Sequence, residues 1–297
     1  MATVLVIGRA EEAPRRRPGA LAAVARVYAR DRQAMLGLAI VLVLAGAAVV
    51  APLLSPWDPL ASVPAERLSP PLTAGHLLGT DEQGRDILSR LTWGGRASLL
   101  VGIVPAVVAG VIALGLGLWA GHRGGLVDHA IMRALDVFFA FPLVLLAIAI
   151  VGIIGPGMGN QMFALTVVLV PYSTRVVRTA TLSVKPLDFV ESVRALGAGG
   201  GRIVARHLLP NVLPPLLVYT STLVGMMIVA SAGLSFLGLG VQPPTPDWGV
   251  MVGNGRLVLY RAAHVATIPG IVIVVAALAF NFIGDGLREA LDPRARR

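Results

Sequence analysis

Four side chains that could bind a metal or transfer protons stand close together in the sequence: His76, Asp81, Glu82 and Asp86. Their spacing does not match the EF-hand calcium loop, and the chain has no His-Glu-x-x-His zinc motif. Asp86 and Arg90 are four residues apart, the spacing of an ion pair on a helix. We therefore interpret the cluster as structural and expect neither a catalytic residue nor a metal site.

Hydrolysis of ATP by this chain is not expected either. A phosphate-binding P-loop requires Gly-x-x-x-x-Gly-Lys followed by Ser or Thr. The only lysine, Lys185, has no such glycines before it and is followed by Pro186. The chain also contains no cysteine, so thiol chemistry is excluded. We predict that the chain is not an enzyme and binds no cofactor itself.

The composition indicates that a lipid bilayer is the solvent for most of these residues. The chain has 297 residues, of which 56% are hydrophobic and only 14% are charged. Soluble domains carry roughly 25% charged residues. A single globular core cannot bury so much apolar surface, so the elements that position any functional side chain must be membrane helices.

Six stretches are long and apolar enough to cross the hydrocarbon core, which takes roughly 20 residues. They are residues 35–54, 97–121, 137–154, 161–178, 212–236 and 265–284. The third and fourth belong to one uncharged stretch, 137–174, which Gly155-Pro156-Gly157 divides by strong turn chemistry. The sequence thus predicts an all-α membrane protein with about six transmembrane helices.

Charge placement predicts the orientation. With both termini in the cytoplasm, 19 of the 25 arginine and lysine residues lie on the cytoplasmic side. This bias follows the positive-inside rule. Topology then accounts for the net charge of +9, and we expect the lipid bilayer, not nucleic acid, as the partner of the basic residues.

The segment between the fourth and fifth spans, residues 185–211, predicts a compact helix–bend–helix element. Asp188 is a suitable N-cap, and Glu191 stands where it completes a capping box. Phe189, Val193 and Leu196 recur at positions that form one apolar stripe.

Glycine and proline then set the bend of this segment. Gly197 is a natural helix stop, the glycines at 199–201 permit a sharp bend, and a second short helix is expected to end at Pro210. Two interpretations stay open on physical grounds. The stripe lies on lipid headgroups, or it enters a groove on a soluble partner.

The same segment resembles the loop signature of permease subunits in bacterial binding-protein-dependent ABC importers. The matching residues are Glu191, Gly197, Ile203, Leu209 and Pro210, whereas Ser192 and Val193 stand where the family has two alanines. In that family the segment is a coupling helix seated in a cleft of the ATPase subunit. The resemblance therefore implies an ATPase-coupling segment made of Glu191, Ser192, Val193, Ala195, Gly197, Ile203, Leu209 and Pro210.

Further motifs resemble the dipeptide/oligopeptide/nickel branch of these importers, in particular its second, C-type permease subunit. They lie at residues 78–96, 132–142, 234–240 and 285–293. The resemblance implies a type I importer permease that pairs with a homologous second permease. It also implies two ATP-binding subunits at the cytoplasmic face, which use ATP and magnesium, and an extracytoplasmic substrate-binding protein.

The expected organisation follows the chain. Residues 1–34 form a cytoplasmic tail, 35–54 the first transmembrane anchor, 55–96 an extracytoplasmic loop, 97–288 a five-helix permease core containing segment 185–211, and 289–297 a cytoplasmic tail. We expect a multi-pass protein of the bacterial inner membrane that imports short peptides or a similar small solute.

One alternative is an ion-coupled secondary transporter or a channel. Such proteins often hold ionisable groups deep in the bilayer. The centres of the predicted spans are nearly free of charge, which favours the ATP-driven importer.

Overall fold

The computed structural model describes residues 20–73 and 75–291, and within them no β-strand forms. Parts of the expected tails, residues 1–19 and 292–297, lie outside the described residues. The five longest helices are α2 (Arg32–Val49), α4 (Ile87–Arg123), α7 (Met158–Val184), α10 (Leu209–Phe236) and α12 (His264–Leu291). The shorter ones are α1 (Ala20–Tyr28), α3 (Ala51–Leu54), α5 (Gly125–Asp136), α6 (Leu143–Ile154), α8 (Asp188–Ala195), α9 (Gly200–Ile203) and α11 (Trp248–Gly255).

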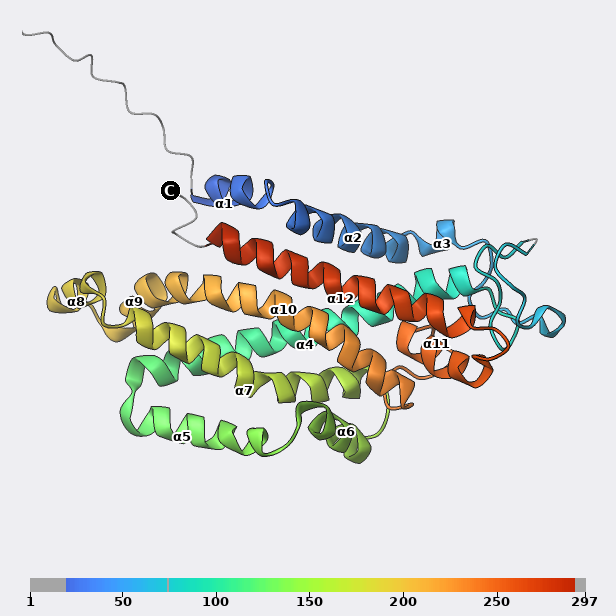
Figure 1. The fold of residues 1–297 in the computed structure, drawn as a ribbon. Coiled ribbons are helices and arrows are strands. Elements are labelled where there is room, and N and C mark those ends of the chain that lie inside the picture. Colours follow the sequence, from blue (N-terminus) through green and yellow to red (C-terminus); the bar gives the residue numbers. More distant parts are fainter. Residues whose placement is uncertain (1–19, 74, 292–297) are drawn as a thin grey trace, which may run out of the picture.

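The long helices run side by side along one axis (Figure 1). Helix α2 lies along α12 at one side of the bundle, whereas α5 and α6 lie at the opposite side. Helices α8 and α9 form one end of the molecule. The loop of residues 55–86, hereafter the long loop, and α11 form the other end. Helices α8 and α9 are therefore separated from the long loop and α11 by the length of the bundle.

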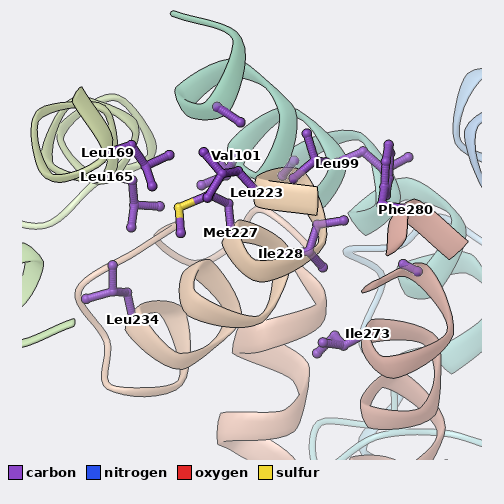
Figure 2. Packing of buried hydrophobic residues seen from close by; sticks show 14 of the residues in the cluster. Leu99, Val101, Leu165, Leu169, Leu223, Met227, Ile228, Leu234, Ile273 and Phe280 are labelled. Atoms are coloured by element: carbon purple, nitrogen blue, oxygen red, sulfur yellow. The ribbon is translucent and has the colours of Figure 1, made fainter. Parts of the chain in front are cut away.

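The core lies where α4, α7, α10 and α12 meet. Met227 and Ile228 of α10 are buried among leucines of α4 and α7, and Phe280 approaches from α12 (Figure 2). Small residues allow these helices to come close. A Cβ added to Gly117 of α4 would lie 2.6 Å from the Cβ of Val177 on α7. Small residues at such contacts are typical of helix packing in membranes.

Four helices of the described chain are long and apolar enough to span a membrane. They are α2, α4, the continuous helix from Gly200 to Phe236, and α12. Helix α7 has 27 residues, enough to span, but it is too polar to belong to this set. Four of the predicted spans are therefore found as such.

The span predicted at residues 137–154 is different. Helix α6 has only 12 residues and forms a bent pair with residues 125–140, at an angle of 89°. Phe141 at the break is extended, with φ −117° and ψ 139°. This conformation is the one that a following proline, here Pro142, favours.

Helix α4 begins at Ile87, ten residues before the span predicted at residue 97 and within the segment predicted as a loop at residues 55–96. Asp86 caps the helix, because its Oδ2 accepts a hydrogen bond of 2.7 Å from the backbone N–H of Ser89. The polar residues at the start of α4 hid this extension from a hydropathy pattern.

Candidate functional site

The segment predicted to couple to an ATPase, residues 185–211, lies at the α8 end of the bundle. It consists of α8, a glycine turn, α9 and one π-helical turn, Val204–Leu208, that leads directly into α10. The segment is therefore joined by backbone to α7 on one side and to α10 on the other.

The predicted capping box does not form. Leu187 is the N-cap, with extended backbone, and Asp188 is already the first helical residue. The helix starts one residue early because the carbonyl of Leu187 accepts hydrogen bonds from the N–H groups of Val190 and Glu191. Asp188 and Glu191 still lie in the first turn, where negative charge complements the helix dipole.

Helix α8 has one buried anchor and a large exposed apolar surface. Val190 is fully buried and belongs to the apolar cluster that also contains Ile203 of α9 and Leu208 of the π turn. Phe189 and Leu196, by contrast, are 42% and 87% exposed, and Val193 is half-buried. The predicted stripe is therefore largely uncovered within the chain. Glu191, Ser192 and Ala195 are exposed as well.

The predicted glycine stop is confirmed. Gly197 has a backbone φ of +82°, a conformation that residues other than glycine rarely adopt. A Cβ added there would meet no atom within 4 Å. Gly199 to Gly201 do not share this conformation. Gly200 instead brings the backbone close to His122, whose Nε2 would lie 3.0 Å from an added Cβ.

The expected helix end at Pro210 is wrong. Residues 200–236 form one continuous helix, and Pro210 lies in the first turn of α10. A proline lacks an N–H group and its ring clashes with the carbonyl four residues earlier. Here the π turn widens the helix just before the proline, and the N–H of Leu209 donates to the carbonyl of Val204. Ile203, on the same helix, is buried, and Leu209 contacts the same apolar cluster.

Polar contacts connect the segment to other helices. The Nζ of Lys185 donates to the carbonyl oxygens of Gly121 and His122, at 3.2 and 2.8 Å, which joins the end of α7 to the end of α4. Two turns earlier on α7, Arg178 binds both carboxylate oxygens of Asp128 on α5 at 2.5 Å. These contacts connect the ends of α4 and α5 to α7, which the chain joins directly to the segment.

The acidic cluster of the long loop is rearranged relative to the prediction. Asp86 does not pair with Arg90. Its Oδ1 lies 2.9 Å from Nδ1 of the buried His76, and Arg90 instead approaches Asp81 at 3.3 Å. Glu66 completes the set at 3.0 Å from Nε2 of His76. In the described part of the chain, no His, Asp and Glu side chains are grouped to hold a metal.

The two carboxylates raise the pKa of His76. Burial by itself lowers the pKa of this imidazole, but hydrogen bonds to Asp86 and Glu66 outweigh burial, so that the pKa lies above its ordinary value. The imidazole also stacks on Trp57, with ring centroids 5.2 Å apart. The cluster therefore holds the long loop together. Sequence spacing gave no signal for Glu66, because its contact with His76 depends on the loop fold.

These features define the class of protein as a helical membrane protein with a partly uncovered amphipathic helix at one end. The sequence matches the family described as "Binding-protein-dependent transport system inner membrane component" over residues 113–297. It also matches "N-terminal TM domain of oligopeptide transport permease C" over residues 20–71. The chain belongs to the binding-protein-dependent transport family and is a permease subunit of an ATP-driven ABC importer.

Named relatives align along most of the chain. The glutathione transport system permease protein GsiD of Pectobacterium atrosepticum is 43% identical over 271 residues, 91% of this chain and 90% of that protein. The di/tripeptide transport system permease protein DppC of Pseudomonas aeruginosa is 41% identical, over 91% of this chain and 90% of that protein. These relatives agree with the C-type permease branch.

A solved structure shares the fold. The inward-facing MetNI methionine ABC transporter contains a chain that superposes with a TM-score of 0.57 at 23% identity. The superposition covers 68% of this chain and 97% of that one. The helical arrangement is therefore that of an ABC importer permease.

Proposed function

We propose that this chain forms half of the translocation pathway of a bacterial importer of short peptides, including glutathione-like peptides. A homologous second permease forms the other half. Two separate ATP-binding subunits hydrolyse ATP with magnesium, and an extracytoplasmic binding protein delivers the solute. The peptide substrate is supported by the names of the relatives, which transport glutathione, dipeptides and tripeptides.

The proposed topology has six spans with both termini in the cytoplasm of a cell whose inner membrane holds the protein. Four helices meet the length and hydropathy requirement. Two further spans complete the six. The bent pair of residues 125–140 and 143–154 is a broken span, the third along the chain, and α7, with 27 residues, is the fourth. This count places α8 and the termini on one side, where arginine and lysine are concentrated.

The observation that carries the coupling role is the uncovered apolar surface of α8. Phe189 and Leu196 are 42% and 87% exposed, so nothing in the described part of the chain covers most of this apolar surface. An amphipathic helix with an unpartnered apolar face fits a groove on another protein. Residues 185–211 therefore seat in the ATP-binding subunits and transmit their closure to α7 and α10.

The test is purification of the chain from its native membrane in mild detergent, followed by identification of co-purifying proteins. We expect a second permease, one or two kinds of P-loop subunit, and ATP hydrolysis that the binding protein stimulates. Mass spectrometry of the ligand carried by that binding protein then identifies the substrate. A chain that purifies alone, or as a homo-oligomer without ATPase activity, contradicts the proposal and favours a channel or secondary transporter.

A further inference from the structure

An ion pair faces outward from the membrane-spanning part of the bundle. Nη2 of Arg175 on α7 lies 2.6 Å from Oδ1 of Asp136 on α5, and the two side chains are 50% and 43% exposed in the chain. Arg175 precedes Val184, the last residue of α7, by nine residues, which is about 14 Å along the helix. The pair therefore lies at the part of α7 nearer α8, inside the span predicted at residues 161–178 and about nine residues before the helix ends.

Aromatic side chains extend this polar site to neighbouring elements. The guanidinium of Arg175 lies 3.9 Å from the ring centroid of Phe139, and Phe139 packs against Tyr172 at 4.6 Å. Tyr219 of α10 lies nearby, since it lines the same cavity as Val176, the residue after Arg175. The polar surface thus continues from the break at Phe141 across α7 to α10.

The surface is hollowed beside Tyr219. A cavity of about 470 Å³ lies between α7, α10 and α12, and Val176, Tyr219, Thr222 and Arg288 are among the residues that line it. Thr222 is exposed, as is Thr179 one turn after Arg175. We name the set Asp136, Tyr172, Arg175, Thr179, Tyr219 and Thr222 the polar strip.

In the described residues of α2, α4 and α12, the outward faces lack such a polar strip. Their large exposed side chains in the middle of the spans are aliphatic, which suits lipid tails. They include Leu42 and Val43 on α2, Val107 and Val111 on α4, and Ile271, Val274 and Leu278 on α12. Charged side chains within spans are costly against lipid and normally face protein or water.

We propose that the polar strip faces water and forms this chain's wall of the translocation pathway in the half nearer α8. Asp136 and Arg175 there present one negative and one positive group to a charged or zwitterionic solute. Because the two charges balance, the wall repels neither end of such a solute. This inference rests on the proposed function, since it presupposes a solute pathway along the chain.

Cysteine labelling tests the accessibility of the strip, because the natural chain contains no cysteine. Thr179→Cys and Thr222→Cys would be made in the complete transporter in lipid vesicles, with Val111→Cys and Val274→Cys as matched controls. Small charged methanethiosulfonate reagents are added on the α8 side, and labelling of this chain is followed by mass spectrometry. We expect the strip cysteines to react at least about tenfold faster than the controls, since thiolate formation requires water.

Equal reaction at all four positions, or no reaction at the strip, overturns the inference. The latter result means that the second permease or lipid covers the strip. Binding-protein-stimulated ATPase activity is measured on the same samples. An active transporter with an unreactive strip refutes the pathway wall alone, whereas absence of stimulated ATPase in the unmodified complex refutes the proposed function.

A charge-selectivity measurement tests the role of the ion pair. In the Thr179→Cys background, Asp136→Asn leaves Arg175 unbalanced and Arg175→Gln leaves Asp136 unbalanced. The quantity compared is the labelling rate with an anionic reagent divided by the rate with a cationic one. We expect this ratio to rise about two- to fivefold in Asp136→Asn and to fall by a similar factor in Arg175→Gln. A merely structural pair would not shift the ratio in opposite directions, so unchanged ratios, or shifts of one sign, contradict the assignment.

Discussion

Replacement of Gly197 tests whether the turn after α8 must keep its left-handed backbone. With φ +82°, a β-branched residue at this position is strained by about 1–2 kcal/mol. No neighbouring atom lies within 4 Å of an added Cβ, so a steric clash within the chain adds nothing. If the ATP-binding subunits require the native turn, Gly197→Val weakens their binding about 5- to 30-fold.

The assay titrates purified ATP-binding subunits onto the permease pair in lipid nanodiscs and measures the dissociation constant. Gly197→Asn is the matched control, because asparagine adopts the left-handed conformation more readily and should lose much less affinity. Gly201→Val controls for a bulky residue nearby at a glycine without positive φ. If Gly197→Val binds the ATP-binding subunits as tightly as the unchanged permease, the left-handed turn is not required. Equal losses of affinity in the valine and asparagine variants would mean that the added side chain, and not backbone strain, weakens binding.

Three further predictions follow from packing and protonation. Gly117→Leu should destabilise the contact of α4 with Val177 by about 1–3 kcal/mol, which thermal unfolding would show as a lower midpoint. Gly115→Leu is the control and should not lower the midpoint, because a Cβ added there meets no atom within 4 Å. Val190→Ala removes the buried anchor of α8, at a cost of about 2 kcal/mol, and should speed hydrogen exchange in α8; unchanged exchange contradicts the anchoring. Because the pKa of His76 is raised, its stabilisation of the long loop is complete below about pH 6.5 and declines as pH rises through the folded-state pKa. Hydrogen exchange of that loop, corrected for intrinsic rates, should therefore speed up at high pH, and a His76→Gln variant that keeps this dependence refutes the role of the imidazole.

Four of the six predicted spans are found as apolar helices long enough to cross a membrane, because an uninterrupted apolar helix gives a clear hydropathy signal. The break at Phe141–Pro142 was missed although a proline stands there, because the surrounding stretch is uncharged and other prolines, such as Pro105 and Pro171, lie inside continuous helices. Helix α4 was predicted too short for the opposite reason. Its first turns are polar, and only the cap made by Asp86 marks where it starts.

Within the candidate site, local conformation was easier to predict than long-range pairing. Gly197 stops α8 because a left-handed residue is a local requirement. Pro210 misled the prediction, since the π turn that accommodates it has no sequence pattern of its own. The predicted pair of Asp86 and Arg90 was also wrong: Asp86 contacts His76, and Arg90 approaches Asp81. Such partners are set by tertiary packing.

The central claim is that α8 enters the ATP-binding subunits while the long loop and α11 face the other side of the membrane. A photo-reactive amino acid placed at Leu196, which is 87% exposed, tests it within the assembled transporter. Leu257, 78% exposed at the opposite end of the bundle, is the matched control position. The account predicts that light cross-links position 196 to a P-loop subunit and that position 257 gives no such product. Cross-linking of position 196 to lipid alone, or of position 257 to a P-loop subunit, would contradict it.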